Sequence, residues 1–138
     1  MVMRKKLMVV FLSFLAIIFG IILIQLFINH SHNNAAKSVS GQFVSDVLNG
    51  DSKDSYALFS SQAQQGTATG DWADTVTTLG NFFAGRNASY ASMSSDKASK
   101  TKTVLYKIPG NDGNYILKVL LTSQSNTWYV ESFSSTRQ

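Results

Sequence analysis

The sequence predicts an α+β protein, in which an N-terminal transmembrane helix is followed by three helices packed on a curved antiparallel sheet of about four strands. Three observations predict this architecture. Residues 7–28 are almost wholly apolar, apolar residues then recur every three or four positions as far as Gly85, and beyond Gly85 they recur at every second position. Helices that precede an antiparallel sheet pack together on one of its faces.

Residues 7–28 are long and apolar enough to cross a membrane. They carry no charge, and only Ser13, Gly20 and Gln25 interrupt the apolar run. At ~1.5 Å per residue the run spans about 33 Å, which exceeds a hydrocarbon core of about 30 Å. A cleaved signal peptide is the alternative, but its apolar region is shorter and ends at a small-x-small site, which Asn34-Ala35-Ala36 does not provide. We therefore expect an uncleaved signal-anchor in the lipid bilayer.

The charges that flank this run predict its orientation. Arg4, Lys5 and Lys6 precede it, whereas the residues immediately after it carry no fixed charge. The positive-inside rule then places residues 1–6 in the cytoplasm and residues 29–138 outside, with the protein in the cell membrane as a single-pass chain. Residues 29–36 are polar and are expected to form an irregular linker.

Two small residues within the apolar run allow a contact between helices. Ala16 and Gly20 form a small-xxx-small pair, which lets two transmembrane helices approach closely. One interpretation of this pair is that copies of the chain associate through it as a homo-oligomer. The alternative is that these are simply two small residues in an apolar helix.

Composition excludes several classes of function. Arg4, Lys5 and Lys6 supply most of the net charge of +4, and the nine basic residues after Ile28 are nearly balanced by eight acidic ones. Nucleic-acid binding requires a basic face on the folded part, so no nucleic-acid partner is expected. The chain has no cysteine, and both histidines, His30 and His32, lie in the expected linker. We expect no metal, no cofactor and no catalytic residue.

Residues 37–85 show helical spacing in three places. The first helix, over residues 37–48, ends at Asn49-Gly50, and Asp51 caps a short second helix. Residues 62–70 are polar and are expected to form a loop. A third helix begins near Asp71 and ends at Gly85. The residues expected to face the sheet from the first and third helices are Phe43, Val47, Trp72, Val76 and Phe83.

Residues 87–133 contain four segments with strand character. Residues 87–94 are a weak candidate, whereas residues 101–108 alternate clearly. The Pro109-Gly110-Asn111-Asp112-Gly113 run predicts a turn before a central strand over residues 115–122. Residues 128–133 form the last strand.

Several of these segments together resemble a known superfamily. The run FVSDVLNGDSKDSYALFSSQ, a Trp-containing helix and strands that end in TWYVESF resemble the NTF2-like superfamily, a cystatin-like α+β cone, over residues 37–134. The resemblance implies a cone of helices and curved sheet, and enzymes of this fold place an acid/base pair and a tyrosine inside it. An N-terminal anchor before such a domain is also similar in architecture to the VirB8-type and TcpC-type envelope components of bacterial conjugation and secretion machines.

A pocket in such a cone has five candidate lining residues: Trp72, Phe83, Tyr106, Trp128 and Glu131. Glu131 would either face inward as a partly buried carboxylate or pair with Lys118 across an exposed strand face. Asp46 would either point into the cone or, as we favour, lie on a solvated helix face. Lys97, Lys100 and Lys102 form a basic cluster that would touch anionic headgroups or a wall polymer, or simply keep a sheet edge solvated.

These expectations combine into two hypotheses of function. The first is a membrane-anchored, non-enzymatic extracytoplasmic binding or assembly module with a protein partner in the bacterial envelope, within a transport or conjugation machine. The second is a small-ligand-binding or enzymatic cone. A cone filled by its own side chains favours the first, and an open apolar pocket with an inward carboxylate favours the second.

Overall fold

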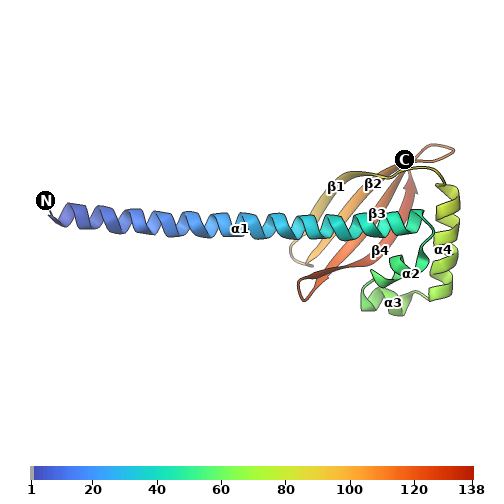
Figure 1. Ribbon diagram of the computed structural model, residues 1–138, viewed down its shortest axis with the longest axis horizontal. Helices are drawn as coiled ribbons and strands as arrows, with labels where there is room; N and C mark the ends of the chain where they lie inside the picture. Colours follow the sequence, from blue (N-terminus) through green and yellow to red (C-terminus); the bar gives the residue numbers. More distant parts are fainter. Residues whose placement is uncertain (1) are drawn as a thin grey trace. The chain divides into compact units, whose positions relative to one another are not determined.

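The computed structural model describes the backbone of residues 2–138 and the side chains of residues 16–138. The chain divides into two units, Met1–Asn34 and Ala35–Gln138, and each is described by itself. Figure 1 labels the helices and strands in chain order: α1 (Val2–Leu48), α2 (Ser52–Ala57), α3 (Ser61–Gly66), α4 (Thr69–Phe82), β1 (Ser89–Asp96), β2 (Thr101–Pro109), β3 (Asn114–Gln124) and β4 (Thr127–Arg137).

The first unit is helical and apolar. Within the described side chains, the large apolar residues between Ile17 and Ile28 are exposed, and Phe27 reaches 75%. By length and composition, α1 is a helix that could serve as a membrane span or a signal-anchor. The side chains of Arg4, Lys5 and Lys6, on which the predicted orientation depends, lie outside the described part of the structure.

The expected irregular linker is wrong, because residues 29–36 are helical and belong to α1. These residues contain no glycine or proline, and Ala35 and Ala36 are strong helix formers, so nothing in this polar run ends the helix. Ala36 is fully buried and belongs to the core of the second unit. The polar residues of this segment therefore belong to a solvent-exposed part of a helix and do not form a loop.

In the second unit, α1 ends and α2 begins where the sequence predicts. Gly50 adopts a positive φ of 78° after α1, and the Asp51 side chain accepts a hydrogen bond from the Asp54 amide at the start of α2. The loop predicted over residues 62–70 is wrong except at Thr67 and Ala68, because α3 covers residues 62–66 and α4 begins at Thr69. Ser60 caps this helix by accepting from the Ala63 amide at 3.1 Å, and the alanine and glutamines that follow favour helix.

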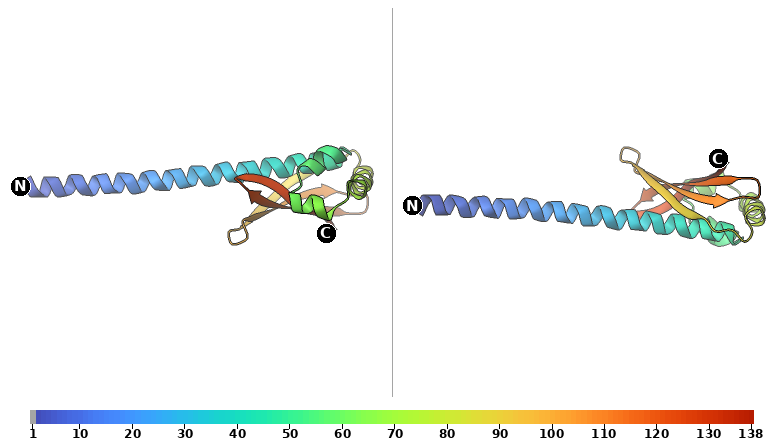
Figure 2. Two further views of the ribbon diagram at one scale, coloured as in Figure 1. Left: turned by 90° about the horizontal axis from the view of Figure 1, so that it is seen from below. Right: turned by 90° about the horizontal axis from the view of Figure 1, so that it is seen from above.

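The four strands form an antiparallel meander in the order β1-β2-β3-β4. Val104 of β2 pairs with Val119 of β3, and a register shift between Leu120 and Leu121 marks a bulge against β4. Bulges increase the local bend and twist of a strand. Figure 2 shows the resulting twisted sheet with the helices of this unit gathered against one face. All four predicted strands are confirmed, with β4 extending to Arg137.

The core lies between this sheet face and the helices. All five predicted core residues are buried, and they meet an alternating row from the central strands. The buried strand residues are Val104, Tyr106, Ile108, Leu117, Val119, Leu121, Trp128 and Val130. The predicted α+β class, with helices on one face of a curved four-stranded sheet, is therefore confirmed.

Candidate functional site

The interior of the second unit is filled by aromatic side chains. Trp72 of α4 lies 4.8 Å from Phe59 and 5.7 Å from Phe43, measured between ring centres, and Phe133 of β4 lies 5.4 Å from Phe43. The Trp72 indole N–H donates to the Ser55 hydroxyl at 2.9 Å. These rings occupy the space that a ligand would take in an open cone.

A second buried contact joins α1 to the sheet. The hydroxyls of Ser40 and Tyr106 are 2.8 Å apart, and burial raises the pKa of Tyr106 above its ordinary value. Ser40 was missed by the sequence analysis. Its position three residues before Phe43 and four before Val44 places it on the apolar face of the helix, so its spacing was a usable signal.

One hollow of about 360 Å³ lies beside Tyr106, between the end of α1 and the segment that joins α4 to β1. Phe83 and Tyr106 line it, whereas Trp72, Trp128 and Glu131 do not. The sequence-based lining set is therefore brought together only in part. The residues around the hollow are Val44, Ser45, Leu48, Asn49, Phe83, Gly85, Arg86, Asn87, Ala88 and Tyr106.

The chemistry of this hollow is limited by its lining. None of its lining residues is a carboxylate or an imidazole, the groups that general acid–base catalysis most often uses. Arg86 is the charged member, and its guanidinium donates to the Gly110 carbonyl at 3.0 Å and to the Asn111 side chain. Arg86 thus ties the α4–β1 segment to the β2–β3 turn.

Glu131 has a structural partner. Its carboxylate accepts a hydrogen bond of 2.6 Å from the Ser60 hydroxyl, the same group that caps α3. Lys118 lies opposite Ser134 in the β3–β4 register, so the Lys118–Glu131 cross-strand pair does not form. Glu131 is half-buried, and its contact joins β4 to the start of α3.

Asp46 differs from the favoured expectation of a solvated position. Its residue is only 7% exposed, and its carboxylate accepts a hydrogen bond of 2.7 Å from Gln42. Burial raises the pKa of Asp46, and the nearby charges of Asp51 and Asp54 act in the same direction. Helical spacing explains the burial, because Asp46 is three residues from Phe43 and adjacent to Val47.

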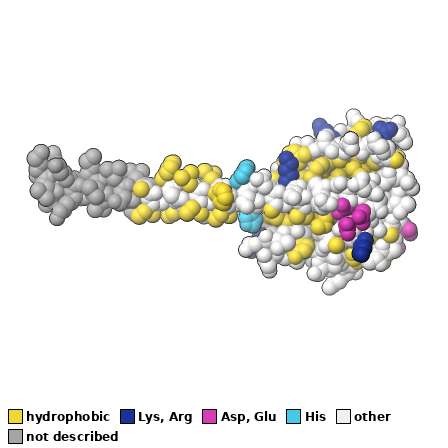
Figure 3. Space-filling view, in the orientation of Figure 1, with side chains coloured by type: hydrophobic (Ala, Val, Ile, Leu, Met, Phe, Trp, Pro, Cys, Tyr) yellow, Lys and Arg dark blue, Asp and Glu magenta, His cyan; other side chains and the backbone are white. Residues whose placement is uncertain are grey.

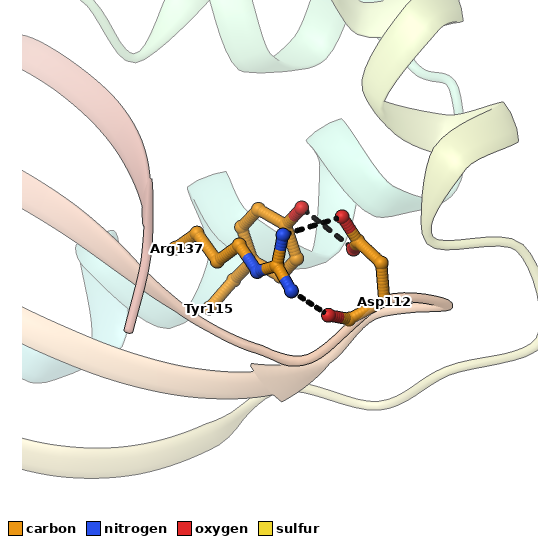
Figure 4. A network of polar contacts seen from close by, with 3 residues as sticks. All are labelled: Asp112, Tyr115 and Arg137. Carbon is orange, nitrogen blue, oxygen red and sulfur yellow. Dashed lines mark hydrogen bonds and ion pairs between the residues drawn. The ribbon is translucent and has the colours of Figure 1, made fainter.

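A polar network closes the far end of the sheet, where the β2–β3 turn meets the end of β4 (Figure 4). The Tyr115 hydroxyl donates to Asp112 at 2.8 Å, and Arg137 forms an ion pair of 3.2 Å with the same carboxylate. The hydrogen bond from Tyr115, aided by Arg137, holds the pKa of Asp112 below its usual value. These contacts hold the β2–β3 turn to the end of β4, which explains the positions of all three side chains.

The remaining candidates occupy separate places. Across the side chains described, no group of three His, Cys, Asp or Glu residues is arranged to hold a metal, His30 and His32 included. Ala16 and Gly20 lie in α1, and a Cβ added at Gly20 would meet no atom within 4 Å. Lys97 and Lys100 are exposed in the turn between β1 and β2.

Comparison with known proteins supports the fold. No family model and no curated protein matches the chain. A solved structure of a putative scytalone dehydratase from Novosphingobium aromaticivorans, an NTF2-like protein, matches with a TM-score of 0.53 and 15% identity, over 80% of this chain and 86% of the other. The second unit has the NTF2-like fold. A DUF4783 family protein from Bacteroides ovatus aligns with a TM-score of 0.47 and 12% identity, over 70% of this chain and 93% of the other.

Proposed function

We propose that the protein is a single-pass membrane protein whose NTF2-like unit is an extracytoplasmic, non-enzymatic binding or assembly module. The apolar α1 supports the anchor, and Arg4, Lys5 and Lys6 before it support an external position for residues 29–138. Residues 29–138, which contain the folded unit, would then lie outside the membrane. The folded unit is therefore the part that would meet a partner.

The observation that carries the proposal is the filled interior. Phe43, Phe59, Trp72 and Phe133 pack together inside the unit, and the two candidate carboxylates do not line the hollow beside Tyr106. Asp46 is engaged by Gln42, and Glu131 is engaged by Ser60. An acid or base for catalysis needs to face a substrate-sized space, and neither Asp46 nor Glu131 lines the hollow beside Tyr106.

In having an anchor before an NTF2-like unit, the chain also resembles the VirB8-type and TcpC-type envelope components in architecture. We therefore place the protein within an envelope transport or conjugation machine. In that setting the unit would act through its surface, and the anchor would hold it at the membrane. The low net charge of the unit favours a protein partner over a nucleic acid.

The test is purification of the full-length protein from membranes in a mild detergent. The proposal predicts recovery of a complex with several envelope components. Ser45→Trp, which would fill the hollow, should leave that complex unchanged, as should the matched exposed substitution Thr77→Trp on α4. Recovery of a lone monomer with a bound small molecule, lost in Ser45→Trp and kept in Thr77→Trp, would overturn the proposal.

That contrary result would establish the second hypothesis, a ligand-binding cone. The hollow of about 360 Å³ favours it, because this volume lies at the lower end of the range for small-molecule sites. Its lining mixes Phe83 and Val44 with Asn49 and Asn87, so a ligand there would be small and partly polar.

A further inference from the structure

Acidic and basic side chains of the folded unit are concentrated in different places. Five aspartates lie near the end of α1 and in or beside α2 and α4: Asp46, Asp51, Asp54, Asp71 and Asp74. Figure 3 shows acidic side chains gathered over the helical part of the unit. Lys97 and Lys100 lie instead in the turn between β1 and β2, with Lys102 at the start of β2. Lys53 of α2 lies among these aspartates, so the helical part is acidic on balance and the β1–β2 turn is basic.

The turn between β1 and β2 presents its positive charges outward. Lys97 and Lys100 are exposed. Lys102 is held lower down, where its ammonium group donates to the Ser95 hydroxyl at 2.6 Å and lies 5.6 Å from the centre of the Trp128 ring. The charge at the tip therefore extends away from the sheet, while the charge at its base is fixed.

Asp96 is the acidic residue of this hairpin, and its carboxylate maintains the turn. It accepts hydrogen bonds from the amides of Ala98 at 3.0 Å and Ser99 at 3.4 Å. Hydrogen bonds from Ser99 and Ala98 hold the pKa of Asp96 below its usual value. One negative charge against three lysines leaves the hairpin clearly positive.

The basic hairpin lies at the end of the unit where its chain begins, at Ala35 (Figures 1 and 2). Lys37 has its ammonium group 4.0 Å from the centre of the Tyr90 ring, which lies near the start of β1 rather than at the β1–β2 turn. Lys37 follows Ile28 by nine residues, which span at most about 30 Å even when fully extended. An anchor at residues 7–28 would therefore keep this end close to the bilayer.

We propose that the β1–β2 turn, with Lys97 and Lys100 at its tip, contacts anionic lipid headgroups of the bilayer that holds the anchor. This inference rests on the membrane anchorage proposed above. Lysines are attracted to an anionic bilayer within about one Debye length, about 8 Å at physiological ionic strength. The covalent tether supplies a high local concentration, so a weak contact suffices to fix the orientation of the unit. The acidic helical end then faces away from the membrane.

The test uses full-length protein in nanodiscs of neutral phosphatidylcholine, with and without anionic phosphatidylglycerol. Because the chain has no cysteine, a nitroxide can be placed at Ala98→Cys in the turn or at Thr78→Cys on α4 as the reference position. We expect the accessibility of the Ala98 label to an aqueous nickel chelate to fall by about twofold or more on anionic discs, because the anionic surface attracts the turn. The Thr78 label should not respond to lipid charge.

Charge reversal distinguishes this contact from a general electrostatic effect. Lys97→Glu/Lys100→Glu should abolish the response of the Ala98 label. Lys107→Glu/Lys118→Glu, which makes the same change of charge at exposed positions of β2 and β3, should preserve it. The inference would be overturned if the accessibility of the Ala98 label to the chelate were the same on neutral and anionic discs. It would also be overturned if that accessibility fell only after a soluble polyphosphate was added. Failure of the protein to enter the discs at all would instead contradict the anchorage.

Discussion

At the scale of single residues, the buried hydroxyl pair of Ser40 and Tyr106 is a specific link between α1 and β2. Ser40→Ala removes the near partner of the Tyr106 hydroxyl and leaves the Lys37 carbonyl at 3.5 Å. We expect a loss of about 1–3 kcal/mol in the free energy of unfolding, because a buried polar group is left poorly satisfied. Denaturant unfolding of the full-length protein in mild detergent, followed by circular dichroism, measures this loss.

Two further variants isolate the pair. Ser38→Ala, at an exposed position of the same helix, should be nearly neutral. In a Tyr106→Phe background, Ser40→Ala should cost much less than in the natural chain, because the unsatisfied hydroxyl is gone. Equal losses in both backgrounds would show that the two hydroxyls are not coupled.

The buried carboxylate of Asp46 makes stability depend on pH. Because burial raises its folded-state pKa, the folded protein holds the proton more tightly than the unfolded chain. Its contribution to stability is present below the unfolded pKa of about 3.9 and is lost as pH rises through the folded pKa. The melting temperature of Asp46→Asn, measured relative to that of the natural chain, should therefore increase as the pH rises from acid to neutral.

Thermal melts across that pH range, with the exposed Asp74→Asn as the matched comparison, test this expectation. The side-chain amide introduced by Asp46→Asn can still accept the hydrogen bond from Gln42, so the packing of the site is retained. A melting difference between Asp46→Asn and the natural chain that shrinks as pH rises would contradict the account.

At the scale of the elements, α4 is held in place through Trp72. The ring packs against Phe43, Phe59 and Phe133, and its N–H is bonded to Ser55. Trp72→Ala should cost about 3–5 kcal/mol in the free energy of unfolding, as expected for a large buried aromatic side chain. Thr77→Ala on the exposed face of α4 is the control. Similar stabilities of the two variants, measured by denaturant unfolding, would show that the cluster does not hold the fold.

The element scale also shows what periodicity can and cannot predict. The spacing of Trp72 and Val76, and the alternation along β2 and β3, were sufficient to place α4 and the central sheet, because burial imposes those periods. The sequence pattern does not predict α3, because none of its residues is buried and it therefore has no apolar periodicity. The part of α1 over residues 29–36 was also missed, because Asn, His and Ser are weak helix formers and their polar run resembles a loop.

The contact between transmembrane helices is a prediction of the same scale. A Cβ at Gly20 meets open space in the single chain, so a larger residue there does not disturb α1 itself. If Ala16 and Gly20 form a contact between two copies, Gly20→Ile should abolish crosslinked dimers in membranes by blocking the close approach. Gly20→Ala should retain most of them. Undiminished crosslinking in Gly20→Ile would exclude this face as the contact.

At the scale of the whole molecule, the sequence predicts the fold more completely than the candidate site. The order of helices and strands follows from local patterns, but the hollow beside Tyr106 depends on how α1 and the α4–β1 segment pack. The expected lining set was chosen without knowledge of which strands border the hollow. Tyr106 of β2 lines it, whereas Trp128 and Glu131 belong to β4, two strands away in the sheet. Long-range register decides which side chains meet.

The central claim is that the NTF2-like unit stands outside a membrane that α1 crosses. Its most direct test is labelling of single cysteines in intact cells by a membrane-impermeant maleimide, after any outer membrane is permeabilised. The chain has no cysteine of its own, and Thr78 is exposed on α4. The account predicts that Thr78→Cys is labelled in intact cells, whereas Met3→Cys is labelled only after lysis. Labelling of Thr78→Cys only after lysis would contradict it.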